Sequence, residues 1–176
     1  MAQWRRQFPA IPGVALPAAP NELPFIDYGP AFAEGGPIME PPRVDRSRAY
    51  AVLVPAVDAL GNDAAGLRAP MVEAPLASYT GWNLRIAGRG AGTLHDFSGS
   101  TLPLPETPAE RELTGDPRPS ILERYGTAQG YVAAIEAAAR ALAADRLLLE
   151  EDIPRAVDAA RDWGRARHHV HLSGDA

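Results

Sequence analysis

The chain of 176 residues is long enough for one domain with a hydrophobic core, and its hydrophobic fraction of 46% is typical of folded proteins. Its net charge of −5 argues against a surface that neutralises nucleic-acid phosphates, and the absence of cysteine excludes disulfides, thiolate nucleophiles and zinc–thiolate sites. No apolar run approaches the roughly 20 residues of a membrane-spanning helix, so we expect neither a nucleic-acid partner nor a membrane partner.

The N-terminal segment combines an arginine pair with closely spaced prolines. Arg5-Arg6-Gln7-Phe8 resembles the core of a twin-arginine export signal. The prolines that follow interrupt the apolar stretch that a signal peptide needs. We therefore do not expect export through this segment; the localisation is left open, with the cytoplasm as the default.

Residues 1–42 are predicted to form a Pro-rich extended arm. Proline fixes φ and lacks an N–H donor, so neither a helix nor a central strand can extend far through this segment. Apolar residues nevertheless recur between the prolines, from Phe8 to Ile38. A solvated linker does not need them, and we expect this segment to lie against a core, either its own or a partner's.

Residues 43–119 are predicted to be β-rich and turn-rich. Tyr50–Val54 is a short β-prone run, and the pair Gly61-Asn62 signals a turn, which together predict a hairpin. The next predicted strand is Leu76–Ile86. Turns are expected from there to the end of the segment.

Residues 120–167 are predicted to form a helical hairpin, followed by a flexible tail at 168–176. Ser120 and Glu123 match a capping box, which satisfies free N–H groups at a helix start. Apolar residues then repeat at helical spacing in two runs: Tyr131, Ile135, Ala138 and Leu142, then Ile153, Val157 and Ala160. The whole chain is therefore expected to be one compact α+β module.

None of the serines occupies a nucleophile elbow. A serine hydrolase of the α/β type places its nucleophile in a G-x-S-x-G turn. None of the six serines has glycine two residues away on both sides, and Ser98-Gly99-Ser100 comes nearest. We interpret these hydroxyls as turn residues.

The histidines offer two further candidates. His95-Asp96, with Ser98 nearby, has the residue types of a general-base arrangement, but neighbours in sequence rarely point at one substrate atom. The C-terminal "HHVH" has imidazoles at a spacing that suits a transition metal, although a solvated terminus is the simpler interpretation. The glycine-rich run Gly88–Gly92 lacks the helix start of a phosphate loop. We predict no metal site and no cofactor.

The segment "LASYTGWNLR", residues 76–85, concentrates aromatic, amide and guanidinium groups. These groups are typical of a binding loop and equally of a buried strand with a polar edge. With the neighbouring His95 and Asp96, the segment therefore offers a set of candidate binding residues but no catalytic residue; the resemblance described below implies that such a set lines a cleft. That set is Tyr79, Trp82, Asn83, Arg85, His95 and Asp96.

Six blocks follow one another along the chain: "FPAIPGVALP", "DYGPAF…GGPI…PP", "YAVLVPAVDALGNDAAGLRAP", "PLASYTGWNLR", "GDPRPSILERYG" and "GYVAAIEAAARALAADRLLLEEDIPRAVDAA". Together they extend from Phe8 to Asp162 and resemble the C-terminal portion of a bacterial family of α/β hydrolase domain-containing proteins. The resemblance implies hydrolysis of an ester- or amide-type bond in a small molecule. It carries "TGWN" onto Thr80, Gly81, Trp82 and Asn83, without an assigned role.

In the family, the nucleophilic serine and the catalytic histidine lie upstream of the part that matches this chain. The resemblance therefore implies a C-terminal module that shapes the substrate cleft or braces a catalytic polypeptide encoded upstream. The alternative is a stand-alone binding module or a decayed hydrolase fragment. Such a module would bind a partner through its apolar N-terminal segment or a small ligand near Trp82 and Arg85.

Overall fold

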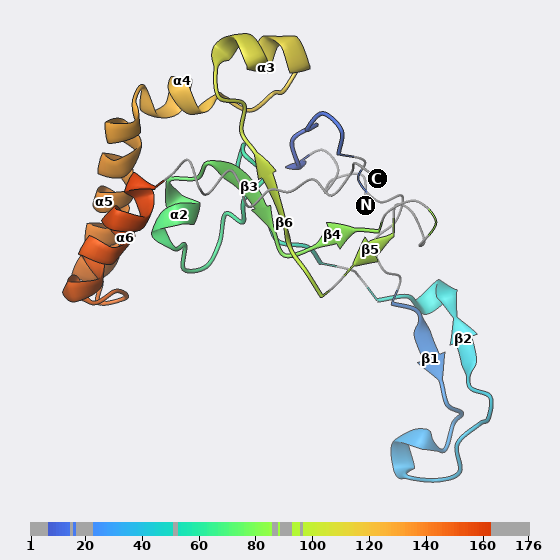
Figure 1. The fold of residues 1–176 in the computed structure, drawn as a ribbon. Coiled ribbons are helices and arrows are strands. Elements are labelled where there is room, and N and C mark those ends of the chain that lie inside the picture. The colour runs from blue at the N-terminus through green and yellow to red at the C-terminus, as the bar shows by residue number, and fades with distance from the viewer. Residues whose placement is uncertain are drawn as a thin grey trace.

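The computed structural model describes residues 7–14, 16, 23–50, 53–85, 88, 93–95 and 97–162. Short antiparallel strand pairs and a group of helices make an α+β fold, as predicted (Figure 1). The strands are β1 (Phe25–Asp27), β2 (Arg43–Asp45), β3 (Ala77–Thr80), β4 (Asn83–Leu84), β5 (Leu94–His95) and β6 (Ser100–Pro103). The helices are α2 (Pro70–Glu73), α3 (Pro108–Thr114), α4 (Ile121–Tyr125), α5 (Ala128–Ala144) and α6 (Ile153–Arg161), with 3-10 turns η1 (Phe32–Glu34), η2 (Arg46–Arg48) and η3 (Glu150–Asp152).

The predicted helical hairpin is confirmed as α5 and α6, which lie side by side in Figure 1. Thr127 caps α5 by accepting a hydrogen bond from the Gly130 N–H. The buried residues of α5 are four positions apart, which places them on one face of the helix. They are Tyr131, Ile135 and Ala139, and in α6 they are Ile153, Val157 and Ala160.

The predicted capping box is also confirmed, but it begins a separate short helix, α4. The Ser120 hydroxyl accepts from the Glu123 N–H, and the Glu123 carboxylate accepts from the Ser120 N–H. The pKa of Glu123 is lowered by these bonds to the Ser120 backbone and hydroxyl, with a further contribution from Arg111. Gly126 then ends α4, because its φ of +70° breaks the helix before Thr127 begins α5.

The stretch from residue 93 to residue 119 contains more regular structure than predicted, since it includes β5, β6 and α3. The start of α3 has a readable signal. Thr107 accepts from the Glu110 N–H, and Pro108 occupies the first turn, where its missing N–H costs nothing. The proline-rich composition of the stretch masks this signal.

The predicted strand over residues 76–86 is instead two strands, β3 and β4, with a bend at Gly81 and Trp82. The Thr80 hydroxyl donates to the Trp82 carbonyl at 2.5 Å, which closes the bend. Because of this bend, β3 pairs with β6 while β4 pairs with β5. Ile86 lies outside the described residues.

The predicted hairpin near residue 60 has its turn, but the described residues of the strand expected before it, Tyr50, Leu53 and Val54, are not in a strand. Gly61 has a φ of +86° in this turn, and a single bridge joins Val57 to Asp63. Leu53 is 89% exposed and lies outside any described strand. The Asp58 carboxylate accepts from the N–H groups of Leu60 and Asn62 and so fixes the turn.

Asn62 makes, through its side-chain amide, the hydrogen bonds to β3 that a third strand would otherwise make. Its side chain is fully buried, donates to the Ala77 carbonyl at 3.1 Å, and accepts from the Tyr79 N–H at 2.7 Å. One amide therefore satisfies two backbone groups on the edge of β3 that faces away from β6. Without it, these groups would be buried and unpaired.

The Arg118 guanidinium is the centre of a hydrogen-bond network that connects four segments. They are the segment of Asp116, the strands β3 and β6, and the residue-60 turn. The side chain is 2% exposed and bonds to both oxygens of the Asp116 carboxylate, at 3.0 and 2.7 Å. It also donates to the Ser78 hydroxyl, and to the carbonyls of Leu102 and Pro103 on β6. The Ser78 hydroxyl in turn donates to the Leu60 carbonyl, so the contact reaches the residue-60 turn.

The hydrophobic core lies between this polar network and α5. It belongs to the described residues from 53 to 162, which we call the body, and a second cluster of Ala139, Ile153 and Val157 joins α5 to α6. The main cluster is Leu60, Ala74, Leu76, Leu104, Ile121, Tyr131, Ile135 and Ala160. None of the described helices is both long and apolar enough to span a bilayer.

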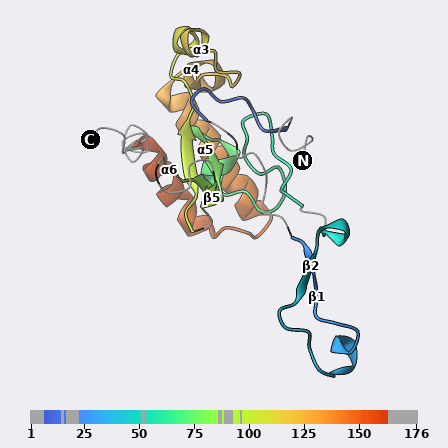
Figure 2. The ribbon, with the colours of Figure 1, turned by 90° about the vertical axis from the view of Figure 1, so that its right-hand side faces the viewer.

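The two described parts of the N-terminal region differ in their packing. Phe8 is 4% exposed and packs over Gly61, where an added Cβ would approach the ring to 3.0 Å. Residues 23–50, which we call the hairpin arm, contain the β1–β2 pair and project from the body in both views (Figures 1 and 2). No residue of the hairpin arm is buried.

Replacing Arg118 with methionine should remove about 3–5 kcal/mol from the free energy of unfolding, because it leaves the Asp116 carboxylate buried without a partner. Urea unfolding followed by circular dichroism measures this change. The matched control is Arg140→Met, which breaks an exposed ion pair with Glu136 and should cost at most about 0.5 kcal/mol. Equal losses in the two variants would contradict the importance of the network.

Candidate functional site

Trp82 lies half-buried where β3 bends into β4. Its ring packs against Phe8, with centroids 5.6 Å apart and the planes tilted by 56°. Its carbonyl accepts hydrogen bonds from the hydroxyls of Thr80 and Ser100. The packing against Phe8 and the hydrogen bonds to the Trp82 carbonyl fix the position of Trp82 at the β3–β4 bend.

Asn83 begins β4 and faces His95 across the β4–β5 pair. Its side-chain oxygen accepts from the Leu84 N–H at 2.8 Å, and its amide nitrogen lies 3.5 Å from the Gly99 carbonyl. Gly99 is required here, because an added Cβ would lie 2.3 Å from the Thr80 carbonyl oxygen. The "TGWN" block thus builds a compact bend supported by its own polar groups.

His95 contacts Ser98 through a local turn. The His95 Nδ1 and the Ser98 Oγ are 3.2 Å apart, and the bond is exposed. The edge of the His95 ring meets Phe97, which is 91% exposed. A catalytic histidine needs a third group to orient it and a site that excludes water. Asp96, the predicted third group, lies outside the described residues.

Tyr79 faces the helices rather than the β4–β5 pair. Burial raises its pKa, and Tyr125 adds to the shift. Tyr125 donates its hydroxyl to the Pro75 carbonyl, and its ring meets Tyr131 edge-on at 5.2 Å. Tyr131 is buried and the other two tyrosines are half-buried, and we call the three phenols the tyrosine cluster.

Arg85 is exposed at the end of β4, where its N–H donates to the Thr93 carbonyl. The structure therefore brings Trp82, Asn83 and His95 together at the β3–β4 bend and the adjoining β4–β5 pair, and with Arg85 we call them the bend group. Tyr79 instead lies close to Tyr125 and Tyr131. The described members of the predicted set thus divide into the bend group and one residue of the tyrosine cluster, while Asp96 lies outside the described residues.

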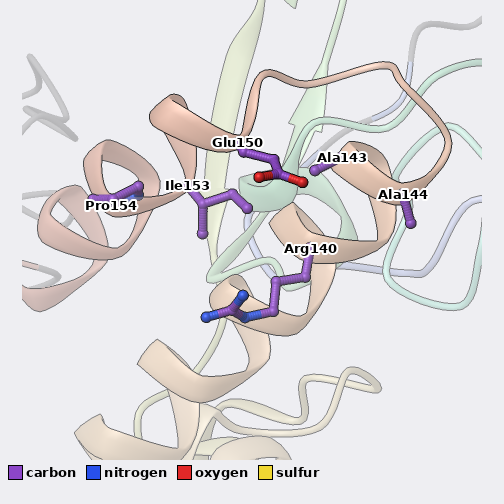
Figure 3. A pocket seen from close by; sticks show the side chains of 6 residues that line it. All are labelled: Arg140, Ala143, Ala144, Glu150, Ile153 and Pro154. Atoms are coloured by element: carbon purple, nitrogen blue, oxygen red, sulfur yellow. The ribbon is translucent and has the colours of Figure 1, made fainter.

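Two hollows lie on the helical hairpin, away from the bend. One has a volume of about 360 Å³ and is shown in Figure 3, where Arg140 and Glu150 extend in different directions. The other, of about 500 Å³, lies between α5 and the end of α6. Neither is lined by a residue of the predicted set, and Arg140 is already paired with Glu136 at 2.6 Å.

Within the described ranges, the structure contains no group of three His, Asp or Glu side chains suited to hold a metal ion. The "HHVH" block and the residues from Arg89 to Gly92 lie outside those ranges. A role for the histidine block therefore stays untested by the geometry.

The most constrained polar residues, Asn62, Ser78 and Arg118, are absent from the predicted set. Arg118 belongs to the block "GDPRPSILERYG", and a carboxylate two positions before an arginine is its one visible signal. The sequence presents Asn62 as a turn residue. Its bonds to β3 depend on a partner 15 residues away, which local patterns do not reveal.

Comparison with protein families gives a match over residues 19–158 to the model described as "Alpha/beta hydrolase domain". Comparisons with curated proteins and with solved structures give no match.

Raising the pH above about 10 should weaken the fold through the tyrosine cluster. Burial, with the neighbouring phenols of Tyr79 and Tyr125, raises the pKa of Tyr131 to about 12. The stabilising contribution of the neutral phenol is complete below the unfolded pKa of about 10, and is lost as the pH rises through the folded value. The loss should approach about 1.4 kcal/mol per pH unit in this window.

Unfolding by urea at a series of pH values from about 8 to about 12 tests this expectation. Tyr131→Phe should flatten the decline. Tyr50→Phe, at a tyrosine that is 60% exposed on the hairpin arm, is the control and should follow the parent curve. Identical declines for all three proteins would show that the cluster does not carry the effect.

Proposed function

The chain belongs to the alpha/beta hydrolase domain family, and on this basis we propose that it serves a hydrolase as a non-catalytic module. In this role it shapes the substrate cleft or braces the polypeptide segment that carries the nucleophile. The substrate class is an ester or amide of a small molecule. The reaction proceeds through attack by a serine from that other segment and an acyl-enzyme intermediate.

The observation that carries the proposal is the lack of a nucleophile elbow. No serine of the chain lies in a G-x-S-x-G context. That turn joins a strand to a helix and exposes the hydroxyl above a sheet. The strands of the described residues instead form three antiparallel pairs. Ser98, whose hydroxyl contacts His95, lies on an exposed turn without a described orienting carboxylate.

The bend group supplies the surface that would line such a cleft. Trp82 offers an aromatic wall fixed by Phe8, and Asn83 and Arg85 offer an amide and an exposed guanidinium nearby. His95 adds an imidazole across the strand pair, and Asp96 follows it in sequence. Tyr79 supports the bend from the side of the tyrosine cluster. These groups recognise polar atoms of a substrate without breaking a bond.

A second candidate function is a stand-alone binding module. It is supported by the hairpin arm, which exposes large apolar side chains without a core beneath them. Exposed apolar surface of this kind marks a site of protein interaction. A reading frame next to the coding sequence that contains G-x-S-x-G favours the hydrolase module, and an unrelated neighbour favours the binding module.

The purified chain should not hydrolyse p-nitrophenyl acetate or butyrate above the rate of buffer, and a fluorophosphonate probe should not label it. Both assays report on an activated serine. Ser98→Ala is the matched variant, and it should behave as the parent does. Turnover or labelling that disappears in Ser98→Ala would refute the proposal and assign catalysis to the Ser98–His95 pair.

A further inference from the structure

We infer that the outer edge of β2 is a self-association surface, where two copies of this chain pair their hairpin arms through antiparallel β2 strands. Within the described residues, β2 is hydrogen-bonded to β1 on one edge and has no strand on the other. Figure 1 shows this second edge facing away from the body, and Figure 2 shows the hairpin arm clear of the coloured segments of the body. A second hairpin arm can therefore approach it directly.

The hairpin arm needs a partner for a physical reason. A two-stranded hairpin is marginally stable in water unless it packs against something else. Here no residue of the hairpin arm is buried, and several large apolar side chains are exposed. They are Leu23, Phe32, Ile38, Met39, Val44 and Tyr50.

The hairpin arm is nevertheless built as a defined element. The Arg43 guanidinium donates to the Asp27 carboxylate at 2.7 Å across the β1–β2 pair. The Arg48 guanidinium lies 3.8 Å above the centre of the Phe25 ring, and Tyr28 stacks on Phe32. These contacts fix the conformation of the hairpin and leave the β2 edge open.

The sequence of β2 makes that edge complementary to itself. The strand reads Arg43-Val44-Asp45. When two such strands run antiparallel with Val44 opposite Val44 of the second copy, Arg43 lies opposite Asp45 of the second copy, and the reverse pair forms as well. Directly opposite residues of antiparallel strands have side chains about 5 Å apart, which suits an ion pair.

Both charged groups retain capacity for this pairing. Arg43 is 70% exposed, and a guanidinium has five N–H donors, of which the described bond to Asp27 uses one. Asp45 receives both bonds from Ser47 on one oxygen, Oδ1, and a carboxylate accepts about four. The Ser47 hydroxyl lowers the pKa of Asp45, so the carboxylate is charged at neutral pH.

The opposite face of the hairpin gains apolar contact from the same register. Ile26 and Val44 are paired across β1 and β2 and share this face, because side chains alternate along a strand. In the four-stranded sheet β1–β2–β2–β1 the two Val44 side chains become neighbours. An apolar row, made of Ile26 and Val44 from each copy, then crosses the dimer.

Charges on an edge strand commonly protect it from pairing. That protection works against a second copy when the charges that face each other are alike. In β2 the facing charges are opposite, so the edge attracts an antiparallel copy of itself. The pattern therefore favours a second copy of this chain as the occupant of the edge.

The test uses the full chain and two single charge reversals. In light-scattering chromatography and sedimentation, the parent should shift from monomer to dimer as the chain concentration rises from about 1 to about 100 μM, as expected of a small interface. Arg43→Asp places two like-charged pairs in its homodimer, and so does Asp45→Arg. Each variant alone should dimerise at least about tenfold more weakly than the parent, since like charges directly opposite are destabilising.

Mixing the two variants should restore dimerisation, because each carboxylate of the Arg43→Asp strand then faces a guanidinium of the Asp45→Arg strand. Native mass spectrometry separates the heterodimer from both homodimers by mass, and restored pairing shows that both variants fold. Glu34→Arg, a charge reversal in η1 at the tip of the hairpin arm, is the matched control and should dimerise as the parent does. A monomeric parent across the range, or a mixture no more dimeric than its components, would overturn the inference.

Discussion

The Arg118 guanidinium is the contact on which the body of this protein depends. It stabilises the β3–β6 strand pair, which would be only marginally stable alone, so that the hydrophobic core can pack against it. Through Ser78 and Asp116 it joins β3 and the residue-60 turn to the segment before α4. Its bonds to the carbonyls of Leu102 and Pro103 attach it to the end of β6, directly before the core residue Leu104. Burial raises the pKa of Asp116, but the bonds and charge of Arg118 outweigh it, so the pKa is lowered and the pair stays ionised.

The parts of the fold that the sequence predicted are those whose cause is local. Helical spacing in α5 and α6 and the Ser120–Glu123 capping box each depend on residues within a few positions of one another. The β3–β4 bend, in contrast, combines the local Thr80–Trp82 bond with a contact between the hydroxyls of Thr80 and Ser100, which are 20 positions apart. The amide of Asn62 likewise bonds to distant partners, Ala77 and Tyr79, and local sequence patterns do not predict contacts over 15 to 17 positions. The short strands carry little periodicity, so tertiary hydrogen bonds decide their limits.

The candidate site follows the same division. The sequence identified the "TGWN" block as chemically rich, and the structure adds that its polar groups bond to one another and to nearby backbone and hydroxyl groups. Asn83 bonds to its neighbour Leu84, the Thr80 hydroxyl bonds to the Trp82 carbonyl, and Trp82 packs on Phe8. Groups that satisfy one another in this way give a rigid surface of fixed shape. A rigid surface without a described nucleophile suits a wall of a cleft better than its reactive centre.

The body and the hairpin arm differ in how completely their polar and apolar groups find partners within the chain. In the body, the amide of Asn62 and the guanidinium of Arg118 find partners across the fold, and apolar residues form a shared core. In the hairpin arm, polar groups pair within the hairpin while its large apolar residues remain exposed. A chain under selection for solubility alone would blunt such an edge with like charges. Arg43 and Asp45, on either side of Val44, instead carry opposite charges that attract a second copy. This association involves the hairpin arm alone, so it does not depend on which function the bend group serves.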